Sequence, residues 1–326
     1  MSARHPFYQW VRLEQPRLGT RVTYATDEFF AAKERIIDPA EPVFIDDKYD
    51  DHGKWMDGWE SRRKRTEGHD FCIIRLGVPG VIRGFDIDTS HFTGNYPPQA
   101  SIEVCVSDVE HPKDGWTELL AKTDLAGDAH HFIEISDEHV WTHVRLHIYP
   151  DGGIARLRIF GEVRADFSGV DGYVDLAAIE NGGRAIACSD EHYGSMHNLN
   201  VHGRGVNMGD GWETARRRGP GNDWVIIALA EAGAIERVEV DTAHFKGNYP
   251  DRVSLDGAMF DGDEFATPES DGWQTLLPET KLKMDQQHYF EELQAIGKVS
   301  HIRMSIYPDG GISRLRLFAR VGGSKE

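Results

Sequence analysis

The chain contains the same thirteen-residue motif twice, and this repeat restricts its possible folds more than any other feature. Residues 148–160 read IYPDGGIARLRIF, and residues 306–318 read IYPDGGISRLRLF. In each copy a proline sets φ for a turn and two glycines supply positive-φ conformations, after which apolar and basic residues alternate as in a β-strand. The motif therefore predicts a strand, a tight turn and a second strand in each half of the chain.

Three other motifs recur in the same order. Each copy begins with an acidic pair, continues with DGWE followed by arginines, and then reads HF, one variable residue and GNYP. The first copy has TDE at 26–28, DGWESRRKR from Asp57 and DTSHFTGNYP from Asp88; the second has SDE at 189–191, DGWETARRR from Asp210 and DTAHFKGNYP from Asp241. Four paired motifs indicate that one ancestral domain was duplicated.

The spacing between equivalent motifs gives the size of the repeat. The offset is 163 residues at the acidic pair, 153 at DGWE and 158 at IYPDGG. Each change of offset marks an insertion, and insertions collect in surface loops. A period of about 160 residues is a whole domain and not a solenoid unit. We therefore predict two homologous domains, 1–165 and 166–326, with the first fold ending near Val163 and residues 164–183 crossing to the second.

The strand pattern favours an all-β fold. Short runs with strand character follow one another in the first copy, such as FCIIRL, VIRGFDID, ASIEVCV, HFIEI and THVRLHIY, and they are separated by Gly, Pro, Asp and Asn. No amphipathic helix of the length that a βαβ unit needs is evident, and only a few helical turns are expected near DEFFAAKERII. The pattern predicts two tandem antiparallel β-sandwiches of the jelly-roll type.

Charge and composition exclude several classes of partner. The 36 Lys and Arg against 54 Asp and Glu give a net charge of −18, so long-range repulsion disfavours a nucleic acid or an anionic membrane surface. The start, MSARHPFYQW, does not resemble a signal peptide, and no apolar run approaches membrane-spanning length. Cys72, Cys105 and Cys188 are too widely spaced for a disulfide framework or a zinc knuckle. These features predict a cytoplasmic protein with free thiols.

The four paired motifs resemble those of the allantoicase family over nearly the whole chain. The resemblance implies a tandem of jelly rolls similar to galactose-binding and discoidin-type modules. It also implies hydrolysis of allantoate to ureidoglycolate and urea, in purine degradation, by a homo-oligomer. The chain has no HxH, HExxH or CxxC cluster, so no cofactor is certain from spacing, while the resemblance leaves open a divalent metal such as manganese.

The substrate's carboxylate needs a cation, and arginines follow each DGWE motif directly. A guanidinium matches a carboxylate in a bidentate geometry that an ammonium cannot reproduce. The alternative is that these arginines neutralise acidic residues of neighbouring loops. The predicted carboxylate-binding residues are Arg63 and Arg65 in the first copy and Arg216 and Arg218 in the second.

Proton transfer to a leaving ureido nitrogen needs an acid and a base. In each DGWE motif a glutamate follows a tryptophan that can limit water access and so raise a carboxyl pKa, and each HF motif brings a histidine just after a strand that ends in Asp88 or Asp241. The alternatives are a glutamate that ties its loop and a histidine that bonds to that aspartate. The predicted catalytic residues are Glu60, His91, Glu213 and His244.

Further polar residues could bind the ureido groups. Asn95 and Asn248 in GNYP present amides, or they only shape a turn. The acidic pairs could bind substrate or a metal, or cap a short helix; they are Asp27 with Glu28, and Asp190 with Glu191.

The sequence leaves two questions open. The copies are not interchangeable, since Arg62 corresponds to Ala215 and Thr93 to Lys246, so either copy or both could carry the site. A non-catalytic tandem jelly-roll protein that binds a carbohydrate or another ligand is the alternative function.

Overall fold

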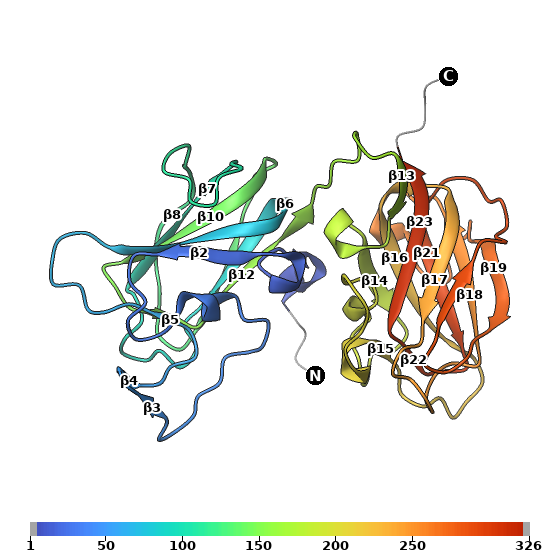
Figure 1. Cartoon of the computed structure of the whole chain (residues 1–326), viewed down its shortest axis with the longest axis horizontal. Helices are drawn as coiled ribbons and strands as arrows, with labels where there is room; N and C mark the ends of the chain where they lie inside the picture. Colours follow the sequence, from blue (N-terminus) through green and yellow to red (C-terminus); the bar gives the residue numbers. More distant parts are fainter. Residues whose placement is uncertain (1–4, 322–326) are drawn as a thin grey trace. The chain divides into compact units, whose positions relative to one another are not determined.

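The computed structural model describes residues 5–321, and the chain divides into two compact units at the boundary between Arg164 and Ala165. Each unit is built from antiparallel β-strands joined by loops and short 3-10 turns (Figure 1). The prediction of an all-β fold made of two homologous sandwiches is therefore confirmed. Within the described residues, no helix is long and apolar enough to cross a membrane.

The first unit contains twelve strands and three 3-10 turns among its described residues. They are η1 (Pro6–Gln9), β1 (Val11–Arg12), η2 (Pro16–Leu18), β2 (Arg21–Ala25), η3 (Lys33–Ile37), β3 (Tyr49–Asp50), β4 (Gly53–Lys54), β5 (Trp59–Glu60), β6 (Asp70–Asp88), β7 (Gln99–Cys105), β8 (Thr117–Asp124), β9 (His130–Glu134), β10 (Val140–Tyr149), β11 (Gly153–Ile154) and β12 (Arg156–Val163). The turn η3 lies where a few helical turns were expected.

The second unit follows a corresponding order in its described residues, with two strands, β16 (Asp223–Gly233) and β17 (Ile235–Asp241), in place of β6 and no counterpart of the β3–β4 hairpin. It contains β13 (Gly172–Asp175), η4 (Ile179–Asn181), β14 (Arg184–Cys188), η5 (Met196–Asn198), η6 (Met208–Asp210), β15 (Trp212–Glu213), β16 (Asp223–Gly233), β17 (Ile235–Asp241), β18 (Arg252–Ala258), η7 (Asp263–Phe265), β19 (Gln274–Lys281), β20 (Gln287–Phe290), β21 (Val299–Tyr307), β22 (Gly311–Ile312) and β23 (Arg314–Val321).

Two sheets enclose the core of the second unit. One has the strand order β14-β16-β21-β18-β19 and the other β13-β23-β17-β20. Alternate residues of the strands point inward, so that Ile227 and Ile302 of the first sheet lie in one buried cluster with Val240 and Leu315 of the second. All four side chains are inaccessible to solvent. The pattern of alternating apolar residues in the sequence thus becomes the contact between the two layers.

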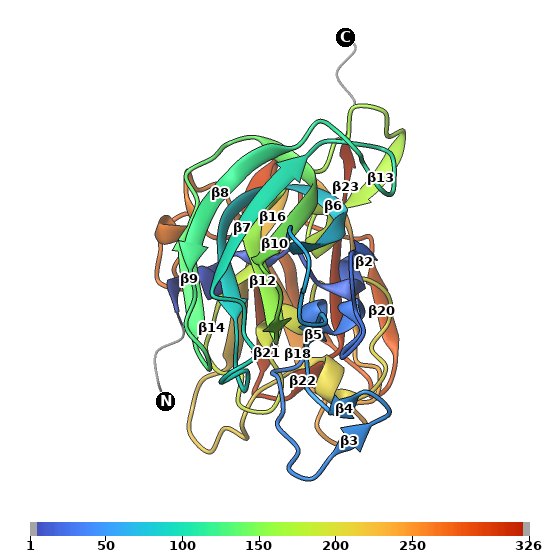
Figure 2. The ribbon, with the colours of Figure 1, turned by 90° about the vertical axis from the view of Figure 1, so that its left-hand side faces the viewer.

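The first unit has the same layers, joined by one long strand. The beginning of β6 pairs with β2 and β10, whereas its end pairs with β9 and β12, and the register slips between the two parts. Figure 2 shows β7, β8 and β10 of this unit side by side. The prediction of two separate strands at FCIIRL (71–76) and VIRGFDID (81–88) is wrong, because β6 continues through residues 77–80 as it passes from one sheet to the other.

Two other expectations about the fold need correction. Residues 164–183 are not only a connection, because β13 pairs with β23 and completes a sheet of the second unit. The edge strands β8 and β19 were not predicted. Most of their side chains are exposed or half-buried, so these strands lack the clear alternation by which a half-buried strand is recognised.

Candidate active site

Backbone hydrogen bonds bring the repeated motifs together at one end of each unit. In the first unit, Gly153 of PDGG donates to the carbonyl of Asn95 over 2.8 Å, and Ser61 donates to the carbonyl of Gly152 over 3.1 Å. The strand β5, which carries Glu60, pairs with β11 and forms a bridge to Ala31 just after the acidic pair. The second unit has the same bonds, from Gly311 to Asn248 and from Thr214 to Gly310.

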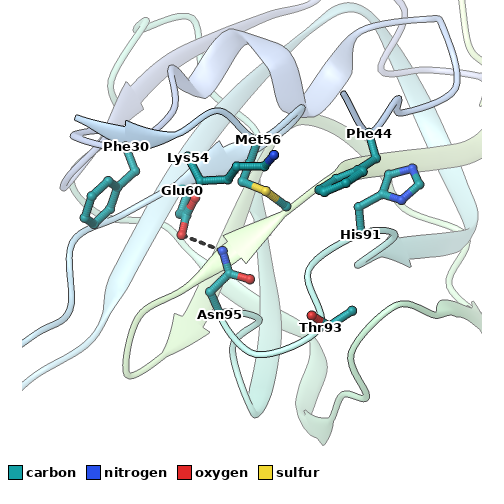
Figure 3. A pocket seen from close by; sticks show the side chains of 8 residues that line it. All are labelled: Phe30, Phe44, Lys54, Met56, Glu60, His91, Thr93 and Asn95. Atoms are coloured by element: carbon teal, nitrogen blue, oxygen red, sulfur yellow. Dashed lines mark hydrogen bonds between the residues drawn. The ribbon is translucent and has the colours of Figure 1, made fainter. Parts of the chain in front are cut away.

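A cleft of about 360 Å³ lies at this end of the first unit (Figure 3). Its walls come from the loop after β2, from the segment leading into β5, from β5 itself and from the loop after β6. The lining residues are Phe30, Phe44, Lys54, Met56, Glu60, His91, Thr93 and Asn95. Three residues that the sequence analysis singled out, Glu60, His91 and Asn95, therefore line one cavity.

Glu60 is a buried carboxyl group held by an amide. Only 8% of the residue is exposed, and Oε1 accepts a hydrogen bond of 2.8 Å from Nδ2 of Asn95. Burial disfavours the charged form and raises the pKa of Glu60, the bond from Asn95 opposes this shift, and the negative charge of Asp50 adds to it. A carboxyl group with a raised pKa in a cleft can deliver a proton nearer to neutral pH than an exposed glutamate.

Two hydrogen bonds hold His91 in place. Its φ is 69°, and its backbone N–H donates to Oδ1 of Asp128 over 2.8 Å. The ring atom Nε2 lies 3.2 Å from the carbonyl oxygen of Pro42. Because a carbonyl oxygen only accepts, Nε2 carries the proton, and in the neutral ring Nδ1 keeps the lone pair. The hydrogen bonds of His91 go to Asp128 and Pro42, and the carboxylate of Asp88 accepts from the backbone of Ser90, so the alternative in which this histidine bonds to Asp88 is not the arrangement in the structure.

The carboxylates of the acidic pairs accept hydrogen bonds from backbone N–H groups. Oδ1 of Asp27 accepts from the backbone of Phe29 and of Arg62. Burial opposes ionisation, but these bonds, together with the guanidinium of Arg62 at 2.7 Å, outweigh it and lower the pKa of Asp27. Oε2 of Glu28 accepts from the backbone of Lys33, the first residue of η3. In the second unit, Asp190 accepts from the backbone of His192 and Ala215, and Glu191 from that of Met196 at the start of η5.

The predicted arginines lie outside the cleft lining. Arg63 and Arg65 are exposed in the segment that follows β5, and so are Arg216 and Arg218 in the second unit. The cation that does line the cleft is Lys54, which the sequence analysis missed. Its position three residues before DGWE was the only signal, and it is not repeated, since Asn207 stands three residues before the second DGWE.

The cleft does not have the donor set of a dedicated metal site. Within residues 5–321, no group of three or more His, Cys, Asp or Glu side chains is arranged to hold a metal ion. The cleft contributes one carboxyl group, Glu60, and one imidazole, His91, whose Nε2 is already bonded to a carbonyl. Zinc sites usually take at least three such protein ligands.

Comparison with known proteins agrees with the repeated motifs. The sequence model of the allantoicase repeat matches residues 11–164 and again 174–322. A curated relative from Burkholderia pseudomallei, "Probable allantoicase 2", is 55% identical over 96% of this chain and 95% of its own length. A "Probable allantoicase" from Pseudomonas syringae pv. syringae is 54% identical over 97% of this chain and 98% of its own.

Solved structures give the same result. The crystal structure of the allantoicase of Saccharomyces cerevisiae aligns with a TM-score of 0.80 and 36% identity, over 95% of this chain and 92% of that one. A second allantoicase structure aligns with a TM-score of 0.81 and 34% identity, over 96% and 94%. From its two repeats, its relatives and its fold, the chain belongs to the allantoicase family.

Proposed function

We propose that this chain hydrolyses allantoate to ureidoglycolate and urea, and that the reaction takes place in the cleft of the first unit. The observation that supports this most is the buried Glu60, bonded to Asn95, in a cavity that His91 also lines. Family membership favours this activity over the alternative of a non-catalytic binding module.

The cleft suits a small polar substrate. Its volume of about 360 Å³ is at the lower end of ligand-binding cavities, which span roughly 300–1,000 Å³. The amide of Asn95 can donate to a ureido carbonyl or accept from a ureido N–H. Met56 and the rings of Phe30 and Phe44 supply the apolar part of the lining. These groups can hold the ureido arms while the central carbon faces the titratable side chains.

The reaction needs one proton delivered and one removed. We assign Glu60, in its protonated form, as the acid that protonates the departing ureido nitrogen, and Nδ1 of His91 as the base that takes a proton from water. The water oxygen forms a bond to the central carbon as the bond from that carbon to nitrogen breaks, and urea leaves. Each such proton transfer contributes about 10²–10⁴ in rate.

We assign supporting roles to the other predicted residues of the first unit. Asp27 and Glu28 hold the DGWE segment and η3, so they position Glu60 without touching substrate. The exposed Arg63 and Arg65 act at long range by attracting an anionic substrate to a chain of net charge −18. Replacing both with alanine should lower kcat/KM most at low ionic strength.

The cellular setting of this activity is part of the proposal. We propose that the chain acts in the cytoplasm as a homo-oligomer, with neither nucleic acid nor membrane as a partner. Light scattering of the purified protein after size-exclusion chromatography measures its mass directly, and a mass equal to one chain contradicts the oligomer.

A urea-release assay tests the proposed function. Purified protein incubated with allantoate should release one urea for each allantoate consumed. Binding to a carbohydrate without any release of urea from allantoate would favour the non-catalytic alternative.

A further inference from the structure

The first unit carries extra residues next to its cleft, and the hydrogen bonds locate them. The backbone N–H of Val43 donates to Asp57, and that of Val206 donates to Asp210, so Val43 and Val206 are equivalent. Between these anchors the first unit has residues 44–56, whereas the second has only residues 207–209. The ten additional residues include the hairpin of β3 and β4. We call residues 44–56 the insertion loop.

The insertion loop forms one wall of the cleft. Phe44, Lys54 and Met56 belong to it, and all three line the cavity (Figure 3). In the second unit, Asn248 is the hydrogen-bond partner of Glu213. The short segment 207–209 brings Met208 against this asparagine, with Sδ 3.9 Å from Nδ2. The amide and carboxyl pair is therefore repeated in both units, but the wall that faces it is not.

The ammonium group of Lys54 lies at this wall of the cleft. Its ammonium lies 4.6 Å from the ring centre of Phe44 and 3.2 Å from the carbonyl oxygen of Ile45, and Figure 3 shows the side chain extending past Glu60 and Met56 toward Phe44. Its carboxylate neighbour is Asp46, at 3.7 Å, whose side chain is 88% exposed. An ion pair with so exposed a partner is weak, so the ammonium remains able to bind a second anion.

We propose that Lys54 binds the carboxylate of the ureide substrate, and that the insertion loop thereby confines substrate binding to the first unit. The inference rests on the proposed function of the same cleft. The cleft then holds a cation for the carboxylate, an amide for a ureido arm, and the acid and base for the carbon between them. In the second unit Asn207 stands at the place of Lys54. Lys246, which replaces Thr93, lies with its ammonium 3.6 Å from the carboxylate of Asp285.

Three variants test the role of the charge in turnover. Lys54→Met should raise KM for allantoate about 10- to 100-fold with a smaller change in kcat, because a charge-assisted hydrogen bond is lost. Lys54→Arg should restore most of the affinity. Lys48→Met is the matched control, since Lys48 lies in the same loop with its ammonium 3.5 Å from the ring centre of Trp55 and does not line the cleft. Equal KM values for Lys54→Met and the control would overturn the proposal.

Calorimetry separates this proposal from the proposed function. Glu60→Gln, which should bind allantoate without turning it over, should bind one molecule per chain, and adding Lys54→Met should weaken that binding about 10- to 100-fold. The neutral carboxamide analogue of allantoate should bind both proteins equally weakly. Binding of two allantoate molecules per chain, or binding unaffected by Lys54→Met, would refute the inference. Lysine-dependent binding with no urea released by the wild type would refute the proposed function alone.

Discussion

Asn95 and Glu60, 35 residues apart in the sequence, are joined by a hydrogen bond of 2.8 Å from Nδ2 to Oε1. The bond links the GNYP loop to the DGWE strand, and the second unit repeats it between Asn248 and Glu213. An amide N–H can only donate, so the bond fixes which face of Asn95 meets the carboxyl group. It also leaves the amide oxygen for other partners.

Replacing Asn95 with aspartate should shift the pH dependence of the reaction. A second carboxylate beside Glu60 repels its charged form, and so raises the pKa of Glu60 beyond the rise that burial already causes. Because the protonated form is the proposed acid, the limb on which kcat falls with rising pH should move to higher pH. Asn248→Asp is the control in the second unit and should leave the profile in place. An unmoved limb in Asn95→Asp contradicts the assignment of the acid.

Replacing Glu60 with glutamine should stabilise the fold at neutral pH. The pKa of Glu60 is raised in the folded state, so the folded protein loses stability as pH rises from the ordinary glutamate range through the raised value. The glutamine side chain does not ionise, so the variant does not lose stability in this way. Thermal unfolding should show equal midpoints for the two proteins below about pH 4, and a lower midpoint for the wild type near pH 7. A higher unfolding midpoint for the wild type than for the variant at neutral pH would contradict the raised pKa. It would show that other interactions fully offset the cost of burying the charged carboxylate.

Adding a methyl group to Gly153 should destabilise the motif end of the first unit. A Cβ atom there would lie 1.9 Å from Cε1 of Phe92, and at Gly311 it would lie 2.0 Å from Cε1 of Phe245. Overpacking of this kind costs about 1–3 kcal/mol. Urea denaturation should show this loss for Gly153→Ala and for Gly311→Ala. Gly94→Ala, where a Cβ meets nothing within 4 Å, is the control and should change the unfolding free energy by less than about 0.5 kcal/mol.

The duplication made the fold predictable. Two copies of each motif fix the same turns twice, and the alternating residues between them identify the core strands. Self-comparison did not reveal β13, because its sequence GYVD (172–175) has no likeness to the paired motifs, although it completes a sheet by pairing with β23. Hydrogen bonding between backbones decides such an edge strand, and side-chain pattern carries little information about it.

The same logic explains which parts of the candidate site were foreseen. Glu60, His91 and Asn95 stand in repeated motifs, and the structure places them on one cleft. Lys54 and Phe44 belong to the insertion loop, which has no counterpart in the second copy, so comparing the chain with itself gives no signal for them. The cleft residues that could not be predicted from the sequence therefore lie in the loop that is not repeated.

The acidic pair shows a different limit. Two adjacent carboxylates in the sequence are equally consistent with a substrate site, a metal site or a cap. The choice depends on whether backbone N–H groups point at the oxygens, as they do at Asp27 and Glu28. Only the folded backbone contains this information.

The release of urea from allantoate by Glu60→Gln, with Glu213→Gln assayed beside it, tests the central claim most directly. A neutral amide cannot donate the acid proton, so kcat of Glu60→Gln should fall by about 10²–10⁴, while Glu213→Gln should keep most of the wild-type rate. Near-normal turnover by Glu60→Gln, or an equal loss in both variants, would contradict a single active site built on Glu60.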